Sequence, residues 1–271
     1  MRVLRVTGPF HAGELEAQRR AGVEETAGRT GRMIRPGIPA PAAAFLAGRA
    51  FLVAATRERG GAVRASMLTG APGFARATGE SEITIDPAGG HVADVREDVA
   101  ATGRIGLLAI DLATRRRMRA NGDAAVAGPS IRVATREVYA NCPQYITPRE
   151  EPRFPFGAER SSARLSAAQQ ERIRGADTFF VASAHPATGP DASHRGGPPG
   201  FVEVSETAIR WRDFPGNRMF NTIGNLLVEP RCGLLFPDFA TGAVLRIEGR
   251  AEVVWEPERE IRVEVARVAE S

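Results

Sequence analysis

The sequence predicts a mainly β fold with a few short helices: two small β-barrels in tandem, preceded by an N-terminal helical arm. Two observations support this prediction. The chain contains an internal repeat whose two copies are each as long as a small domain. Within each copy, apolar and polar residues alternate in short runs bounded by glycine or proline, which is typical of β-strands. Several short strands with one short helix favour a small barrel.

The repeat keeps one register over most of its length. Ser66 in ASMLTGAPGF corresponds to Ser193 in ASHRGGPPGF, 127 positions later. A period of this length is too long for a solenoid repeat or a propeller blade, so we expect each copy to be a domain. The same offset aligns these further pairs without a gap: Gly70/Gly197, Pro72/Pro199, Gly73/Gly200, Phe74/Phe201, Asp86/Asp213, Gly89/Gly216, Arg104/Arg231, Gly106/Gly233, Asp111/Asp238, Arg119/Arg246 and Gly122/Gly249.

The second copy has the clearest pattern of elements. The expected order is strands Phe179–His185, Pro199–Val204 and Ala208–Phe214, a helix within Met219–Pro230, and strands Cys232–Phe239 and Ala243–Trp255. The helix is expected because Phe220, Ile223 and Leu227 recur at helical spacing and a proline follows. Phe51–Arg57 is the counterpart of the first of these strands. A glycine inside the last strand indicates a bulge or bend.

Three segments lie outside the two copies. Phe10–Arg32 predicts one or two exposed helices packed on a barrel, and Arg35–Pro41 is expected to be a linker. Ala140–Phe156 is proline-rich and predicts an extended connection, whereas Leu165–Gly175 predicts a helix with Ser166 as its N-cap. We therefore divide the chain into a helical arm with linker, a first barrel, a connection and a second barrel: residues 1–45, 46–140, 141–175 and 176–271.

Charge and composition argue against several function classes. The net charge is +4, and all 36 basic residues are arginine, so a bound phosphate must be held by arginine, hydroxyl or backbone N–H groups. The charge is mild, acidic residues are interleaved and only 6% of residues are aromatic, so we expect no nucleic-acid binding. No apolar run approaches the roughly 20 residues of a membrane helix, and the start lacks an apolar signal core. We therefore expect a cytoplasmic protein.

Cysteine and histidine spacing argues against a disulfide framework and against a metal site. Cys142 and Cys232 lie in different segments and form no CxxC motif. The four histidines show no metal-ligand spacing such as HExxH. No GxGxxG or Walker A pattern follows a predicted strand. We expect no metal, and we assign no catalytic residue.

Four segments of the second copy carry a resemblance to a known family. GGPPGF, RDFPGNRMFNTIGNLL, GLLF and LRIEGRAEVV occur in this order between Thr178 and Trp255. They resemble the pyridoxamine 5′-phosphate oxidase-related, FMN-binding split-barrel family, and FHAGELEAQRRAGV and ANCPQYI resemble its longer, two-copy members. The resemblance implies tandem six-stranded split β-barrels, FMN at a barrel–barrel interface, and oxidoreductase chemistry. It fixes no substrate, because fold does not dictate function.

The turn Asp213–Arg218 is the first part of the candidate FMN site. A tight turn followed by a helix start presents N–H groups to an anion, and Arg218 could form a bidentate contact with the phosphate. The alternative is a purely structural turn in which Asn217 caps the helix. The residues expected to contact the cofactor from this segment are Asp213, Gly216, Asn217, Arg218, Asn221, Thr222 and Asn225.

The segment Ser193–Phe201 is the second part. Its glycines would let the backbone approach the flavin ring, and Arg195 or His194 near the N1 and O2 edge of the ring would stabilise the reduced flavin. The alternative is a surface loop with incidental charges. The residues expected to contact the cofactor here are Ser193, Arg195, Gly197 and Gly200, together with Trp211. Trp211 fits a core position better than a stacking position.

The last long strand offers a different interpretation. Arg246 and Arg250 alternate onto one face with Glu248 and Glu252. We expect these four side chains to form a solvated ladder of ion pairs.

The first copy keeps the structural residues of the site and loses the anion-binding ones. We therefore expect one flavin per chain, with the first barrel as the partner in an intrachain pseudo-dimer. The alternative is a homodimer in which the second barrel pairs with its symmetry mate. The replaced positions, first copy against second, are Gly90 for Asn217, His91 for Arg218, Asp94 for Asn221, Val95 for Thr222 and Leu68 for Arg195.

The resemblance and the site lead to three function hypotheses. The first is an FMN-dependent oxidoreductase that passes electrons or hydride through the flavin to an unknown small-molecule substrate, with a nicotinamide nucleotide or oxygen as a further reactant. The second is a non-catalytic module that binds flavin, haem or deazaflavin. The third is a barrel without a ligand that serves as an interaction scaffold. The tandem architecture departs from the single-barrel oxidase, which argues against pyridoxamine phosphate as the substrate.

Overall fold

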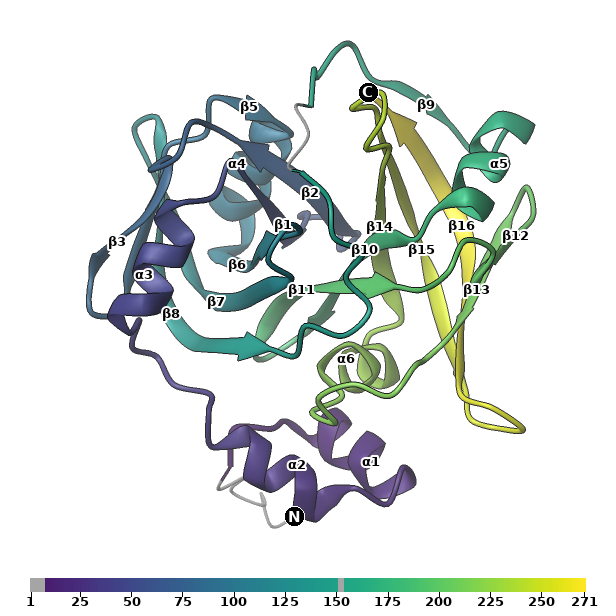
Figure 1. Ribbon diagram of the computed structural model, residues 1–271, viewed down its shortest axis with the longest axis horizontal. Coiled ribbons are helices and arrows are strands. Elements are labelled where there is room, and N and C mark those ends of the chain that lie inside the picture. The colour runs from purple at the N-terminus through teal and green to yellow at the C-terminus, as the bar shows by residue number, and fades with distance from the viewer. Residues whose placement is uncertain (1–7, 151–153) are drawn as a thin grey trace.

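The computed structural model of the protein describes residues 8–150 and 154–271. Two curled antiparallel sheets lie side by side, with short helices at their margins and two N-terminal helices beneath them (Figure 1). The predicted fold class, mainly β with a split-barrel-like arrangement and N-terminal helices, is confirmed. Residues 1–7 of the predicted arm and 151–153 of the predicted connection lie outside the described residues.

The first sheet contains eight strands, and helices α3 (Ala40–Ala47) and α4 (Val92–Thr102) accompany it. Its strands follow one another in space as β3 (Ala75–Gly79), β4 (Glu82–Ile85), β8 (Ser130–Asn141), β7 (Arg116–Ala127), β6 (Arg104–Asp111), β1 (Phe51–Arg57), β2 (Val63–Thr69) and β5 (Gly89–Gly90).

The second sheet repeats this order, with α5 (Ala167–Gly175) and α6 (Asn221–Val228) in the places of α3 and α4. Its strands are β12 (Val202–Val204), β13 (Ala208–Arg212), β16 (Glu260–Glu270), β15 (Val244–Val254), β14 (Arg231–Pro237), β10 (Thr178–His185) and β11 (Gly189–Gly196), and β9 (Arg160–Ser162) pairs with β16. Each sheet thus has eight strands rather than the expected six. The predicted connection contributes one of them, because residues 160–162 add to an otherwise open edge of β16.

Local sequence features account for the helix and strand ends. Ser166 caps α5 through a reciprocal hydrogen bond with Gln169, as predicted. The register between β15 and β16 shifts at Glu248/Gly249, where a glycine bulge was expected. The segment Gly189–Gly196, for which no strand was predicted, pairs along its whole length with β10. The loop interpretation of Ser193–Gly196 is therefore wrong.

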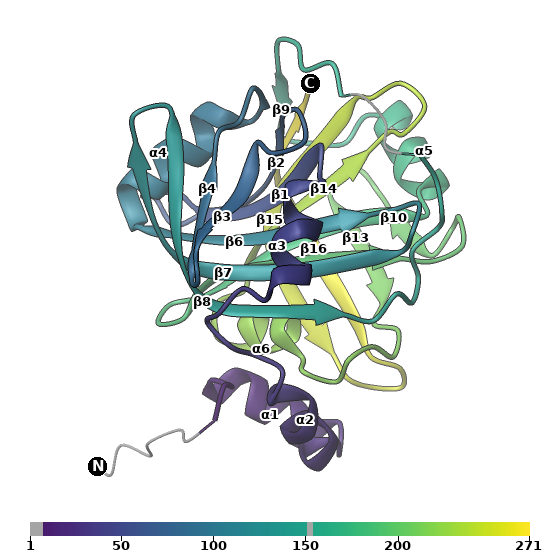
Figure 2. The ribbon, with the colours of Figure 1, turned by 60° about the vertical axis from the view of Figure 1, so that its left-hand side comes forward.

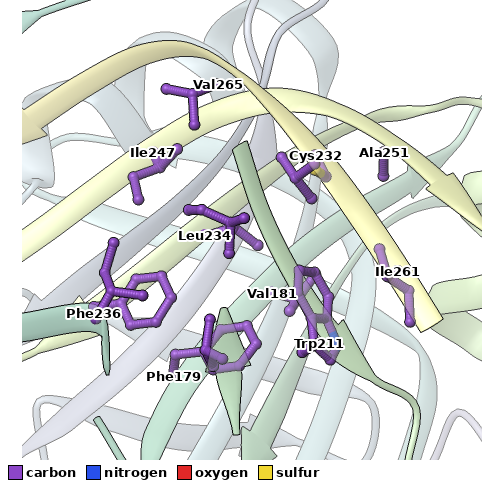
Figure 3. Packing of buried hydrophobic residues seen from close by; sticks show 14 of the residues in the cluster. Phe179, Val181, Trp211, Cys232, Leu234, Phe236, Ile247, Ala251, Ile261 and Val265 are labelled. Carbon is purple, nitrogen blue, oxygen red and sulfur yellow. The ribbon is translucent and has the colours of Figure 1, made fainter. Parts of the chain in front are cut away.

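Each half has its own apolar core, and a third core joins them. Figure 3 shows the core of the second half, in which Phe179 stacks on Phe236 with ring centroids 4.8 Å apart and meets Trp211 edge-on. Full burial of each such side chain contributes about 1.5–3 kcal/mol. The joining core takes members from both sheets, among them Val53 and Phe180. The two halves are therefore held together by continuous apolar packing.

Two equivalent glycines allow the sheets to approach. A side chain at Gly106 would place its Cβ 2.4 Å from the Pro190 carbonyl oxygen, and one at Gly233 would lie 2.5 Å from the Ala65 nitrogen. Gly106 and Gly233 are matching positions of the repeat. The backbone that each one meets also matches, because residues 190–191 lie 127 positions after residues 63–64. The contact is therefore repeated across the interface, once from each half, as a pseudo-two-fold axis requires.

The N-terminal helices α1 (Ala12–Arg20) and α2 (Glu24–Gly31) lie beneath α6 in both views (Figures 1 and 2). Helix α1 packs closely on α6 because Gly13 and Gly224 face each other; a Cβ on Gly13 would lie 2.1 Å from the Gly224 carbonyl oxygen. Within the described residues, no helix is both long and apolar enough to cross a bilayer. The cytoplasmic location stays a prediction.

Candidate functional site

A cleft of about 360 Å³ lies where the second sheet meets the first sheet and the arm. This volume falls within the usual range for small-molecule sites. Strand β7 of the first half contributes Arg117 and Arg119, and strand β11 contributes Ser193–Gly196. The segment Trp211–Ile223 forms the opposite wall, and the α1–α2 turn closes one side. The cleft is therefore built from both halves of the repeat.

Nine of the twelve predicted cofactor-binding residues line this cleft. They come from three separate elements, which the fold brings to one place. The nine are Ser193, Arg195, Trp211, Asp213, Gly216, Asn217, Arg218, Asn221 and Thr222.

Gly197, Gly200 and Asn225 do not line it. A Cβ on Gly197 would meet the ring of Phe201 at 2.6 Å, so this glycine makes room for the protein's own side chain. Gly200 adopts a φ of +89°, a turn conformation that glycine accepts without strain. Asn225 donates to the Ser183 hydroxyl at 3.0 Å and lies 2.9 Å from the His11 ring. These three residues make structural contacts in the protein, and their cofactor contacts stay predictions.

Arg119 organises the inner wall of the cleft. Its Nη1 donates to both carboxylate oxygens of Asp191, at 2.9 and 3.0 Å, and lies 3.2 Å from the Tyr139 hydroxyl. The same group contacts the Asn221 amide oxygen at 3.3 Å, and Nη2 donates to the Ser193 hydroxyl. Arg119 is buried, and its charge is balanced by Asp191. It therefore fixes β11 and the start of α6 relative to β7.

Arg117 and Arg195 add positive charge beside this pair. Arg195 donates to the Ser193 hydroxyl at 2.7 Å, and Arg117 donates to Nδ1 of His194 at 2.7 Å. Burial, together with Arg119 and Arg195, lowers the pKa of Arg117 to about 9. Burial also lowers the pKa of Arg195, an effect that Asp213 partly offsets. Neither guanidinium makes an ion pair with a carboxylate among the described residues.

His194 is neutral at physiological pH and accepts a hydrogen bond from Arg117. Burial and the neighbouring arginines hold its pKa well below the usual value. Since Nδ1 accepts the hydrogen bond from Arg117, the proton of the neutral ring resides on Nε2. The ring therefore offers an N–H group.

Buried polar atoms without a partner gather on residues that line the cleft. Buried polar groups normally form hydrogen bonds, so each exception requires an explanation. Five of these atoms are N–H donors, and the sixth, a hydroxyl, can also donate. Within the described part of the chain, the six are Nε of Arg117, Arg119 and Arg195, Nε2 of His194, Nε1 of Trp211 and Oγ1 of Thr222. Such a set is complementary to an anion or to a ligand rich in acceptors.

The rim of the cleft is held in an unusual backbone conformation. Arg218 and Phe220 both adopt positive φ angles, of 62° and 64°, which non-glycine residues rarely do. Helix α6 begins only at Asn221, and Asn217 accepts from the Met219 N–H at 3.1 Å instead of capping the helix. The capping alternative for Asn217 is therefore wrong. Asp213 accepts from Arg259 at 2.8 Å, while the exposed Arg218 makes no ion pair with any described residue.

Aromatic side chains form one side of the cleft. Tyr145, from the connection, stacks on Phe214 with ring centroids 5.4 Å apart and donates to the Pro215 carbonyl at 3.0 Å. Phe214 in turn stacks on Phe201. The connection reaches this position because Gly196 lacks a side chain: a Cβ there would lie 1.8 Å from the Tyr145 carbonyl oxygen.

Sequence reasoning missed Arg117, Arg119 and Tyr145. Arg119 matches Arg246 in the repeat, and alternation within RRRMR places Arg117 and Arg119 on one face of a strand. These signals were present in the sequence. They did not show that this face of the first half meets the site of the second.

Arg246, the counterpart of Arg119, lies in a different environment from the one predicted. It is buried, donates to Asp94 at 2.7 Å and contacts Glu159 and the Ser66 hydroxyl. The solvated ladder with Arg250 is therefore wrong, because Arg246 turns towards the first half instead of towards solvent.

One protein family matches the second half of the chain. Residues 165–270 match the pyridoxamine 5′-phosphate oxidase family. No curated protein matches the chain.

Three solved structures each match part of the chain at low sequence identity. HupZ of Group A Streptococcus is 14% identical (39% of this chain and 98% of that one covered, TM-score 0.33). A FAD-binding protein of Mesorhizobium loti is 13% identical (42% and 96% covered, TM-score 0.31). HutZ, the haem storage protein of Vibrio cholerae, is 11% identical (39% and 93% covered, TM-score 0.29).

Proposed function

We propose that the cleft binds FMN and that the protein is an FMN-dependent oxidoreductase, a proposal supported by the match of residues 165–270 to the pyridoxamine 5′-phosphate oxidase family. The small-molecule substrate is reduced or oxidised at the flavin, and a nicotinamide nucleotide or oxygen serves as the other reactant. The first half completes the site, so one chain binds one flavin.

The observation that carries this proposal is the excess of positive charge and of unpartnered donors on the residues that line the cleft. Arg117, Arg119 and Arg195 lie together, and among the residues described only Asp191 balances them directly. Burying charge without a partner costs free energy, so the arrangement favours an anionic ligand. FMN carries a dianionic phosphate and a polar ribityl chain rich in hydroxyl groups, which can satisfy both charge and donors.

The shape and chemistry of the rest of the cleft suit the remainder of FMN. Tyr145, Phe201 and Phe214 provide flat apolar surfaces on one side, where a planar ring can be shielded from water. When bound, the flavin supplies the redox chemistry. The protein's own contribution is to bind and orient it, and the positive charge of Arg117 and Arg195 would stabilise negative charge on the reduced ring.

The proposal is tested by FMN binding and by turnover. The purified protein is dialysed against FMN, and its visible spectrum is recorded before and after anaerobic addition of a nicotinamide nucleotide. We expect a bound-flavin spectrum that bleaches on reduction and returns with oxygen. A protein that takes up FMN without any bleaching supports the binding module instead. A protein that takes up haemin or a deazaflavin but not FMN contradicts the cofactor assignment.

The variant Arg117→Gln tests whether the positive charge in the cleft contributes to FMN binding. Loss of a charge-assisted hydrogen bond in a buried setting should weaken FMN binding by about 1.5–3 kcal/mol. The control is Arg132→Gln, an exposed arginine on β8 of the same half. Arg218→Ala, at the exposed rim, should have a smaller effect than Arg117→Gln. Equal losses in Arg117→Gln and Arg132→Gln would mean that the effect is one of net charge alone.

A further inference from the structure

A second cavity lies in the first half, between α3 and the ends of β7 and β8. Its volume is about 580 Å³, within the range of small-molecule sites. Its apolar lining comes from the proline-rich entry to α3 and from the two strands, with Phe45, Met118 and Val138 among the residues. Arg117 forms the wall that this cavity shares with the FMN cleft.

The polar lining of this cavity is one-sided in charge. Arg35, Arg115, Arg116 and Arg117 line it, and no acidic residue does so within the described part of the chain. The guanidinium of Arg116 lies over the Phe45 ring, 5.1 Å from its centroid, so it faces the apolar wall. Arg35, Arg115 and Arg116 form no ion pair with a described carboxylate. Positive charge is therefore placed around an apolar space without a counter-charge from the protein.

The side chains of Arg35, Arg115 and Arg116 are exposed, and the backbone of two of them has a defined conformation. Arg115 adopts a φ of 55°, a strained conformation that non-glycine residues rarely occupy outside sites where structure enforces it. Arg35 is fixed by reciprocal backbone hydrogen bonds with Val138 on β8. Arg115 thus lies in a hairpin turn, and Arg35 lies in a segment that is hydrogen-bonded to β8.

The equivalent position of the second half holds an ion pair instead of an aromatic ring. Helix α5 starts 127 residues after α3, so Arg172 takes the place of Phe45. Arg172 makes an ion pair with Glu270 at 2.6 Å. Leu245 matches Met118 in the repeat. Because Glu270 pairs with Leu245 and Ala140 pairs with Met118, Glu270 is the counterpart of Ala140. The second half thus fills this position with an internal ion pair, whereas the first half leaves arginines around a cavity.

We propose that this cavity is a second binding site, for an amphiphile with one anionic head group and an apolar body. The head group, a carboxylate or a phosphate, pairs with Arg35, Arg115 and Arg116. The apolar body lies against Phe45 and Met118. The proposal does not depend on the proposed function, because Arg35, Arg115 and Arg116, which would pair with the head, do not line the FMN cleft, and only Arg117 in the shared wall belongs to both.

The test uses decanoate, decyl phosphate and decanol as probes of the full-length protein, by titration calorimetry in the presence of saturating FMN. We expect at least one of the two anions to bind about tenfold more tightly than decanol, and the tighter one identifies the head group. Arg115→Gln and Arg116→Gln should each weaken that anion about threefold to fivefold and leave decanol unchanged. Arg132→Gln, on the exposed face of β8, is the control and should change nothing.

Equal affinity for decanol and both anions, no effect of the two substitutions, or an equal effect of Arg132→Gln would each overturn the proposal. Absence of binding by all three probes would overturn it as well. FMN uptake by Arg116→Gln should match that of the unaltered protein, so a failure of this site is distinguishable from a failure of the FMN site.

Discussion

Arg119 and Arg246 occupy matching positions in the two halves, yet only one of them faces an open cleft. Arg119 contacts Ser193 and Asn221, and Arg246 contacts Ser66 and Asp94, so the two constellations are equivalent residue by residue. The difference lies in what surrounds them.

The group around Arg246, which includes Ser66 and Asp94 of the first half, is neutralised and covered by the protein's own side chains. Asp94 and Glu159 neutralise Arg246, and Phe156 packs edge-on against His91, with ring centroids 5.1 Å apart. In the second half, Asn221 replaces the carboxylate, and Arg195 stands where the first half has Leu68. The two halves therefore carry similar sets of residues that differ in charge, and we propose that this difference leaves only the Arg119 cleft able to bind an anionic ligand.

The largest expected effect comes from removing each central arginine in turn. Arg119→Met leaves Asp191 buried without its cation, which should lower the free energy of unfolding by about 3–5 kcal/mol and abolish FMN binding. Arg246→Met leaves Asp94 and Glu159, whose side chains are 35% and 28% exposed, and should cost about 1–2 kcal/mol. Urea denaturation measures both. Equal losses of stability, or loss of FMN binding in Arg246→Met only, would contradict the comparison.

A second prediction exchanges residues between the halves. Arg195→Leu gives the open cleft the residue of the closed one and should weaken FMN binding by about 1.5–3 kcal/mol without unfolding the protein. Fluorescence titration of FMN measures the change.

The reverse exchange serves as its counterpart. Leu68 belongs to the core of the first half and is fully buried. Leu68→Arg should therefore destabilise the protein by several kcal/mol and should create no second FMN site, because burying an unpaired charge is costly. A stable Leu68→Arg protein that binds two flavins would show that one residue distinguishes the halves.

A smaller effect should appear in the arm, which packs against α6 of the second half. Glu14 is buried and accepts from the Asn221 amide at 2.6 Å. Burial raises its pKa to about 8. A carboxyl whose folded pKa lies above its unfolded value stabilises the protein most at low pH and loses that contribution as pH rises through 8.

The unaltered protein should therefore lose about 2 kcal/mol of stability from this group between pH 6.5 and 8.5. Glu14→Gln should lose less over the same interval. Burial lowers the pKa of His11 to about 4, so its opposing contribution is confined to pH below about 6.5. Urea denaturation at the two pH values measures the difference, and parallel pH profiles would show that Glu14 is ionised throughout.

Much of the fold could be predicted because local and repeated signals agreed. The matched glycines Gly106 and Gly233 mark the sheet interface, and Ser166 marks a helix start. Strand β11 was missed because PDASHRGG contains proline, aspartate and glycine and lacks a strong strand pattern. Its pairing with β10 and its burial supply the stability, and these depend on tertiary context.

The candidate site could be predicted only in part, for a related reason. Residues from the second copy, such as Asn221 and Arg195, carried a local motif. Arg117 and Arg119 carried only strand alternation and the match of Arg119 to Arg246, and an arginine on an alternating strand is usually exposed. Only the docking of one sheet on the other places them in the cleft, and a single sequence does not specify that geometry.

The number of flavins bound per chain tests the central claim most directly. Equilibrium titration of the protein with FMN, at chain concentrations well above the Kd, should give one flavin per chain. Arg195→Leu should weaken that binding, and Arg246→Met should retain it. Two flavins per chain, or a single flavin lost in Arg246→Met and unaffected in Arg195→Leu, would contradict the claim that only the second half keeps an open site.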